Sequence, residues 1–139
     1  MKIYFAASIT NNNSNIDLYN KIIKHLSSYG KVLNKKIGDE KFLHKRKRII
    51  FSKKQVHDFD LSLLLKADVV IAEITIPSLG VGYEIGRAVE RNKPVLSLYH
   101  KKVEKHLSAM IIGSSEIINY PYQTFSDIKL IIDNFFSSL

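Results

Sequence analysis

The sequence predicts an α/β protein: a Rossmann-like, doubly wound sheet of five parallel strands, covered by helices on both faces. Short apolar runs alternate with segments of helical periodicity from one end of the chain to the other, the order that gives β-α-β units. The clearest run, DVVIA at residues 68–72, is apolar almost throughout, which is typical of a strand buried on both faces. The length of 139 residues suits one domain, so we expect a single domain over residues 1–139.

In the first half of the chain the patterns predict two strands and two helices. Residues 2–7 (KIYFAA) are an apolar run that ends in a polar stretch, as a buried strand does. Residues 16–29 carry apolar side chains at helical spacing, and Gly30 stands where a helix C′ glycine is expected. A short strand is expected at 31–33. After a basic region comes a helix at 55–66, with an apolar face made by Phe59, Leu63 and Leu64.

In the second half, strands and helices alternate after the strand at 68–72. The elements expected there are strands at 94–99 and 116–120 and helices at 79–91, 106–112 and 125–136. Ser78 precedes the first of these helices and is predicted to cap it. Right-handed crossovers bring the carboxyl ends of all the strands to one edge of the sheet, where ligands of such folds bind.

A single basic segment gives the chain its net charge of +8. Residues 41–54 hold seven of the 21 lysines and arginines and none of the 13 acidic residues, which leaves 14 basic and 13 acidic residues, or +1, elsewhere. Such a segment is either a nucleic-acid patch or a solvated loop near the site. It has few aromatic neighbours for base stacking, so the loop is favoured and a nucleic-acid partner is not expected.

Residue types and patterns that are missing narrow the class of protein. The chain has no cysteine, which excludes disulfides, thiolate zinc sites and cysteine nucleophiles. It has no apolar run of the roughly 18 residues that a membrane helix needs, and its first residues fit a strand better than a signal peptide. No G-x-G-x-x-G follows the first strand, and neither G-K-[ST] nor H-x-x-x-H occurs. We therefore expect a cytoplasmic protein, or a nuclear one in a eukaryote, without membrane contact, metal or cofactor.

The most informative stretch is residues 72–88, AEITIPSLGVGYEIGRA. It runs from the end of a strand through a loop into the start of a helix. Gly80 and Gly82 fall in the first helical turn, where each costs about 0.8–1 kcal/mol relative to alanine. Small residues there leave backbone N–H groups open to an anion. The alternative is a well-capped helix whose glycines serve packing.

Glu84 is the candidate nucleophile of this helix. It lies beside the face expected to be buried, which we assign to Leu79, Tyr83, Ala88 and Val89. A carboxylate that is partly enclosed and kept ionised by the helix dipole suits nucleophilic attack. The alternative is a solvated surface glutamate.

Two further side chains are candidates for the same site. Asp60 lies within the apolar stripe of the helix at 55–66, with Asp58 as the competing acid, whereas Asp68 fits a turn before a strand. Tyr4 lies inside the first strand, where its hydroxyl needs a partner. A surface aspartate and a structural tyrosine are the plainer interpretations.

Four segments in this order resemble the nucleoside 2-deoxyribosyltransferase superfamily, most closely its 2′-deoxynucleoside 5′-monophosphate N-hydrolase branch. They are IYFAASI at 3–9, HDFDL at 57–61, the run at 67–88, and LSAMI at 107–111. The part that reads PSLGVGYE is specific for that branch. The resemblance implies a Rossmann-like sheet, a homodimer with shared active sites, and cleavage of a deoxynucleotide to free base and 2-deoxyribose 5-phosphate.

The resemblance also implies catalytic roles. Glu84 would attack the sugar C1′ and form a covalent glutamyl-sugar intermediate, which water would hydrolyse as in retaining glycosidases. Tyr4 would hydrogen-bond Glu84 and hold it in line. Asp60 would orient Glu84 or the sugar and assist departure of the base.

Substrate-binding roles follow in the same way. Ser78 and Gly80 would hold the 5′-phosphate, and the pocket lining would include Ser8 and Ile9. Ser108 would reach the phosphate from the partner subunit, with Met110 near the base. The chain departs from the family at Thr10, where an arginine often stands, so a guanidinium that would pair with phosphate is lost.

Two alternative functions remain open from the sequence. In a deoxyribosyltransferase a second base accepts the sugar, and that branch tends to carry acid or amide groups where Ser78 and Ser108 stand. A non-catalytic nucleotide sensor could use the same fold, but the joint presence of Tyr4, Asp60 and Glu84 argues against it.

Overall fold

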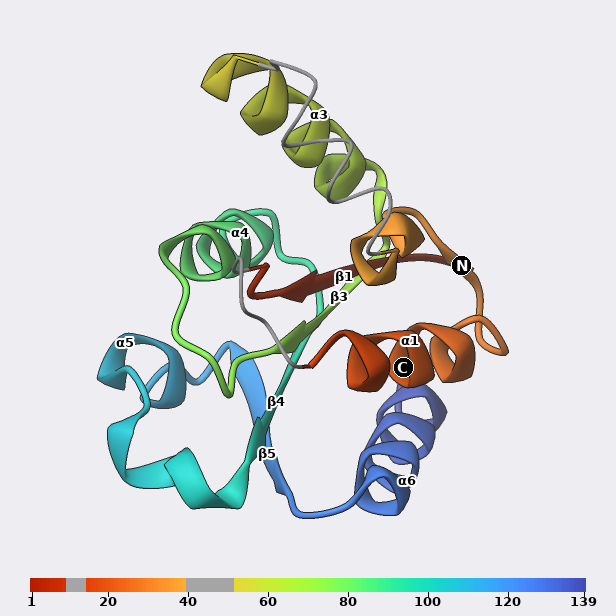
Figure 1. Ribbon diagram of the computed structural model, residues 1–139, viewed down its shortest axis with the longest axis vertical. Helices are drawn as coiled ribbons and strands as arrows, with labels where there is room; N and C mark the ends of the chain where they lie inside the picture. The colour runs from red at the N-terminus through yellow and green to blue at the C-terminus, as the bar shows by residue number, and fades with distance from the viewer. Residues whose placement is uncertain (10–14, 40–51) are drawn as a thin grey trace.

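The computed structural model describes residues 1–9, 15–39 and 52–139. At its centre lies a sheet of five strands in the order β2-β1-β3-β4-β5 (Figure 1), all of them parallel. The strands are β1 (Lys2–Ala7), β2 (Lys31–Val32), β3 (Val69–Glu73), β4 (Val95–His100) and β5 (Ile117–Tyr122). The predicted single α/β domain is confirmed.

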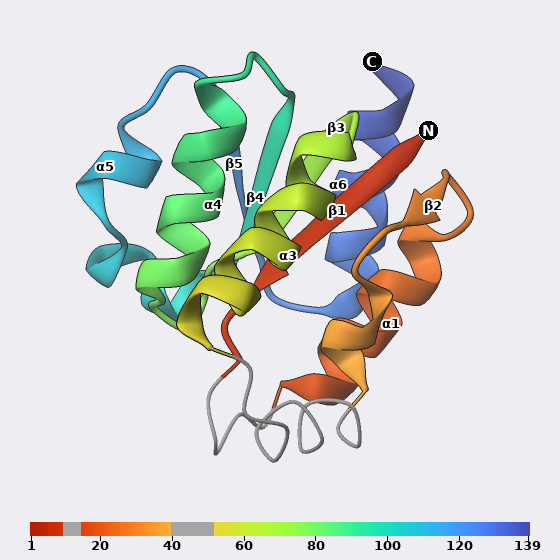
Figure 2. The same ribbon diagram turned by 90° about the horizontal axis from the view of Figure 1, so that it is seen from above.

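Helices cover both faces of the sheet, as Figure 2 shows from above. They are α1 (Ile16–Leu26), α3 (Lys53–Lys66), α4 (Leu79–Val89), α5 (Ala109–Ile112) and α6 (Phe125–Ser137), with short 3₁₀ helices η1 (Lys35–Gly38) and η2 (Lys101–His106). None of the helices in the described part of the chain combines the length and apolarity needed to cross a membrane.

The alternation of side chains along β1 divides the core into two layers. Ile3 and Phe5 pack with buried residues of α1 and α6. Tyr4 and Ala6 point to the other face and pack with buried residues of α3 and α4. The helices that cover Tyr4 are therefore α3 and α4.

The order of the strands decides where a ligand fits. The chain moves from β1 outward to β2, and then returns to place β3 on the other side of β1. In sheets of this order the crevice lies beyond the carboxyl ends of the strands at this reversal. Here those ends are Ala7 in β1 and Glu73 in β3.

Gly30 has a different role from the one predicted. The first helix ends at Leu26, three residues before the predicted end, and Gly30 has no positive φ. A Cβ at Gly30 would lie 2.3 Å from the carbonyl oxygen of Met1, which accepts the N–H of Lys31 at 2.9 Å. The glycine is therefore required for the close approach of the chain to β1, and the prediction that Gly30 is the C′ residue of the helix was wrong.

The face that α4 buries also differs from the prediction. Val81, Ile85 and Ala88 are buried, whereas Leu79 is 96% exposed and Tyr83 is 45% exposed. Capping by Ser78, which the sequence predicted, fixes the start of the helix. From that start, steps of four and then three residues bring Val81, Ile85 and Ala88 to the side of the helix that faces the sheet. Leu79 and Tyr83 lie on other sides of the helix.

Three other boundaries move for local reasons. Helix α3 begins at Lys53 because Ser52 and Gln55 form a capping box, and of its predicted apolar face only Leu64 is buried. The helix expected at 106–112 is divided between η2 and α5. Strand β5 continues through Pro121, which an edge strand tolerates.

Candidate active site

Glu84 is held by Tyr4 across the core layer between β1 and α4. The Tyr4 hydroxyl donates to Glu84 Oε1 at 2.7 Å. Tyr4 is only 2% exposed and Glu84 is half-buried, so the tyrosine is rigid and the carboxylate reaches the surface. This bond joins residues 80 positions apart and orients one carboxylate oxygen while the other side of the group faces a cavity.

That cavity has a volume of about 390 Å³ and lies at the switch between β1 and β3. Tyr4, Asp60 and Glu84 all line it, and Ser78 and Gly80 line it at the start of α4. Among the described residues no cluster of three or more His, Cys, Asp and Glu could hold a metal ion. The cavity therefore brings together two carboxylates, a buried phenol and a helix N-terminus.

The start of α4 has the features of an anion site. Ser78 Oγ accepts the N–H of Val81 at 3.3 Å, which leaves its own hydroxyl proton available to a ligand. A Cβ on Gly80 would touch only Ser78 Oγ, at 3.7 Å, and a Cβ on Gly82 would meet nothing within 4 Å. Packing within the described chain thus does not require these glycines, and the N–H groups of the first turn, with the helix dipole, favour a negative ligand.

The other predicted site residues fall in different places. Ile9 lines the cavity of Glu84. Ser8 is buried beside it, and its carbonyl accepts the Tyr19 hydroxyl at 3.3 Å. Ser108 and Met110 line a second, larger cavity of about 720 Å³ on the other side of α4, which also touches Ser78. Within one chain, Ser108 and Glu84 thus line different cavities.

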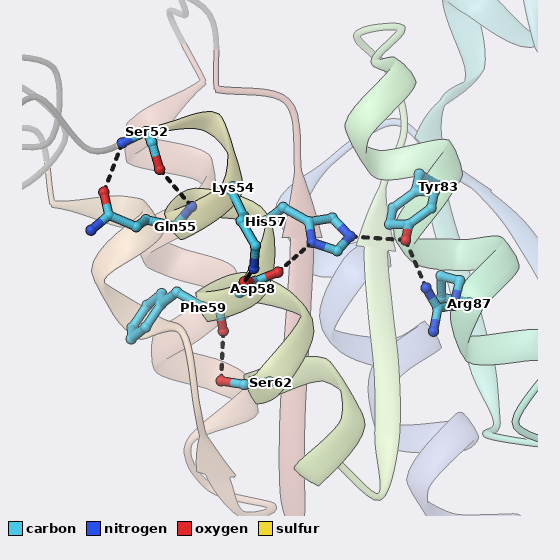
Figure 3. Close-up of polar contacts among 9 residues, drawn as sticks. All are labelled: Ser52, Lys54, Gln55, His57, Asp58, Phe59, Ser62, Tyr83 and Arg87. Carbon is cyan, nitrogen blue, oxygen red and sulfur yellow. Dashed lines mark hydrogen bonds and ion pairs between the residues drawn. The ribbon is translucent and has the colours of Figure 1, made fainter.

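Polar contacts join α3 to α4 (Figure 3). Arg87 donates to the Tyr83 hydroxyl at 2.7 Å, and Tyr83 contacts His57 Nε2 at 3.0 Å. The other ring nitrogen of His57, Nδ1, lies 2.9 Å from Asp58 Oδ1. This bridge joins His57, three residues before Asp60, to Tyr83, the residue before Glu84.

Asp58, the competing acid, belongs to the surface side of this bridge. It pairs with Lys54 as well as His57, and the Lys54 hydrogen bond, followed by that of His57, holds the pKa of Asp58 below its usual value. Asp60, two residues on, lines the cavity instead.

The segment after β2 is a wall of the cavity that the sequence patterns did not reveal. Asn34, Lys35, Lys36 and Ile37 line it. Asn34 is fixed by both atoms of its amide: Oδ1 accepts the Phe5 N–H at 2.9 Å, and Nδ2 donates to the Phe5 carbonyl at 2.6 Å. Polar residues after a short strand carry no periodic signal, so only the fold identifies them. Thr10 and most of the basic segment 41–54 lie outside the described residues.

Glu73 is a second buried carboxylate, at the end of β3 on the opposite face from Glu84. It is fully buried. Its Oε1 accepts the Thr75 N–H at 3.1 Å, the Thr75 hydroxyl, and the Tyr122 hydroxyl at 3.0 Å. Burial raises the pKa of Glu73, and the hydrogen bonds oppose that shift. The carboxylate thus anchors the start of the loop that carries Ser78.

Replacing Glu73 with Ala is expected to lower the free energy of unfolding by about 1–3 kcal/mol for each buried donor left unpaired, measured by urea denaturation. Glu73→Gln keeps an acceptor oxygen and is the milder control. The pKa of Glu73 in the folded state lies above its ordinary value of 4.5. The stabilising contribution of the protonated Glu73 side chain is therefore present below pH 4.5 and is lost as pH rises through the folded-state pKa. A pH dependence of stability identical in wild type and Glu73→Gln would contradict this account.

The comparisons with known proteins agree on one family. The family model described as nucleoside 2-deoxyribosyltransferase matches residues 3–132. A Nematostella vectensis relative named putative 2′-deoxynucleoside 5′-phosphate N-hydrolase 1 is 41% identical over 99% of this chain and 95% of its own length. A Danio rerio relative named 5-hydroxymethyl-dUMP N-hydrolase is 38% identical over 100% of this chain and 98% of its own. A solved Clostridium botulinum CMP N-glycosidase is 18% identical, with a TM-score of 0.69 over 97% of this chain and 99% of its own, which shows the shared fold.

Proposed function

Because this chain belongs to the nucleoside 2-deoxyribosyltransferase family, we propose that it is an N-glycosidase that hydrolyses 2′-deoxynucleoside 5′-monophosphates to a free base and 2-deoxyribose 5-phosphate. The observation that carries the proposal is the 2.7 Å bond from Tyr4 to Glu84. It fixes a half-buried carboxylate in a cavity shared with Asp60 and with the anion-binding start of α4. The names of the relatives, both N-hydrolases of 2′-deoxynucleoside 5′-phosphates, support cleavage of the N-glycosidic bond in this class of substrate.

In the mechanism that fits this arrangement, Glu84 attacks C1′ as the bond from C1′ to the base nitrogen breaks. The electron pair of that bond leaves with the base, which takes up a proton. Water then attacks C1′ of the glutamyl ester, releases 2-deoxyribose 5-phosphate and restores the carboxylate, as in retaining glycosidases. Asp60 orients Glu84 or the sugar and assists departure of the base. A 2-deoxy sugar has no 2-hydroxyl to withdraw electrons from the oxocarbenium-like transition state, so a nucleophile and a weak acid suffice.

The direct test is incubation with a panel of nucleosides and nucleotides, in ribo and deoxy forms, followed by chromatography for released base. Release from deoxynucleoside monophosphates supports the proposal. Transfer of the sugar to an added second base would support the transferase alternative. Binding without release of base from any member would support the nucleotide sensor.

We also propose that the enzyme is a homodimer with shared active sites. Within one chain Ser108 and Glu84 line different cavities, which meet at Ser78, and in a dimer the partner's Ser108 would supply a second hydroxyl to the site of Glu84. Leu79 and Met110, which line the cavity of Ser108, are 96% and 83% exposed. A symmetric pairing of two chains would bury both and bring each Ser108 to the site of its partner.

For assembly, light scattering should give twice the 15.9 kDa mass of the chain. Met110→Glu should shift the mass to that of a monomer and lower activity, because a charge in a buried apolar interface is costly. Leu130→Glu is the matched control, since Leu130 is 62% exposed on α6, away from the cavity. A fully active wild-type monomer would refute the dimer.

A further inference from the structure

The cavity of Glu84 has apolar lining residues besides the catalytic side chains. They are Phe59 and Leu63 of α3 and Leu33 and Ile37 after β2, and we call this part of the lining the apolar end of the cavity. None of these four residues has a role in the mechanism above.

The sheet order fixes which part of a substrate reaches this end, given the proposed function on which the inference rests. Ser78 follows β3 and Ile37 follows β2, and β1 with Tyr4 lies between them. In a nucleotide the base is attached at C1′ and the phosphate, through C5′, at C4′, so the two groups lie on either side of the ring oxygen. With the phosphate at Ser78 and C1′ at Glu84, the base must extend toward Phe59 and Ile37.

Phe59 is placed to meet a flat ligand. Its side chain is 55% exposed, and within the described ranges its ring stacks on no other aromatic ring. Figure 3 draws the ring on the side of α3 opposite Tyr83 and α4, toward the segment that follows β2. The other aromatic lining the cavity, Tyr4, is committed to Glu84.

The polar groups at this end do not supply a code for one base. Asn34, the side chain best suited to read a base edge, is held by both amide atoms to the backbone of Phe5, which leaves one N–H and one lone pair in a fixed orientation. Lys35 and Lys36 also line the cavity, but an ammonium only donates and meets ring carbonyls of several bases. Recognition at this end therefore rests on the aromatic face and the apolar walls.

We propose that Phe59 is the stacking platform for the nucleobase, and so determines affinity for the base without selecting strongly among bases. Stacking of a base on an aromatic side chain is tolerant of sequence, because every base has a π face. Its loss changes affinity by about 5- to 150-fold.

The test measures binding by calorimetry in the Glu84→Gln protein, which holds substrate without turning it over. The probes are 2′-deoxyuridine 5′-monophosphate, 2′-deoxyadenosine 5′-monophosphate and 2-deoxyribose 5-phosphate, which has no base. Adding Phe59→Ala should weaken both nucleotides about 5- to 150-fold and leave 2-deoxyribose 5-phosphate unchanged. Phe59→Trp should keep nucleotide affinity, and Phe59→Leu, which is apolar but has no π face, should lose it.

Two controls separate stacking from damage to the fold. Leu130→Ala, an exposed apolar change on α6, should leave all three affinities unchanged, and thermal unfolding should show Phe59→Ala folded. Equal weakening of nucleotides and 2-deoxyribose 5-phosphate would overturn the proposal, as would unchanged nucleotide affinity in Phe59→Ala. If wild type releases base from no nucleotide while binding still depends on Phe59, the proposed function fails and the platform stands.

Discussion

Replacing Glu84 with Gln should remove nearly all N-glycosidase activity, by about 10⁴-fold or more in kcat, the scale seen when a nucleophile is removed from other covalent enzymes. Gln is isosteric with Glu, so its side chain keeps the contact with the Tyr4 hydroxyl. In the wild type this contact is the 2.7 Å hydrogen bond to Glu84 Oε1. It carries no negative charge and cannot form the ester with C1′. Base release, followed by absorbance or chromatography, is the measurement.

A trapped intermediate would identify the attacking atom directly. Mass spectrometry of wild type with a slow substrate should find a 2-deoxyribose phosphate adduct on the peptide that contains Glu84, and none in Glu84→Gln. Glu90→Gln is the matched control, because Glu90 follows the same helix and its side chain is 69% exposed. Near-wild-type turnover by Glu84→Ala would end the covalent mechanism.

The sequence was sufficient to predict the fold because each strong local signal agreed with the global one. An apolar β-branched run such as β3 can only be buried on both faces, and Ser78 caps α4 as its position suggested. The site was accessible to the same reasoning only in part. Periodicity places Tyr4 on one face of a strand, but its bond to Glu84, 80 positions away, depends on how β1 and α4 pack.

The errors arose where a local pattern allows more than one outcome. Glycines at three positions of α4 leave few apolar side chains to define its buried face, so Leu79 and Tyr83 were assigned to the core although both are exposed. Phe59 was placed on the apolar face of its helix with Leu63 and Leu64, yet it is 55% exposed and lines the cavity. Gly30 fitted a helix cap, and the contact that requires it, with Met1, is invisible in the sequence.

Removing the 5′-phosphate from the substrate should lower kcat/KM by at least about 10-fold, and by about 100-fold or more if two hydrogen bonds are lost. Hydrogen bonds to a charged group contribute roughly 1.5–3 kcal/mol each, and about 1.4 kcal/mol is tenfold. In the proposed site Ser78 and the N–H groups near Gly80, which line the cavity at the start of α4, would supply such bonds. Deoxynucleosides should therefore react poorly, and ribonucleotides least, because their 2′-hydroxyl raises the barrier at C1′.

Serine variants locate this preference in the protein. Ser78→Ala and Ser108→Ala should each narrow the ratio of kcat/KM between a deoxynucleotide and its nucleoside. Ser62→Ala should not, because Ser62 is a half-buried serine of α3 that lines neither cavity. The ratio is the proper readout because Ser78 also caps α4, and loss of a cap costs about 1 kcal/mol of stability whichever substrate is present. Thr10→Arg should tighten nucleotide binding where its guanidinium reaches the phosphate. Free deoxynucleosides that react as fast as their monophosphates, with a second base trapping the sugar, would replace the hydrolase with a transferase, since only an enzyme that does not use the phosphate for binding can ignore its loss.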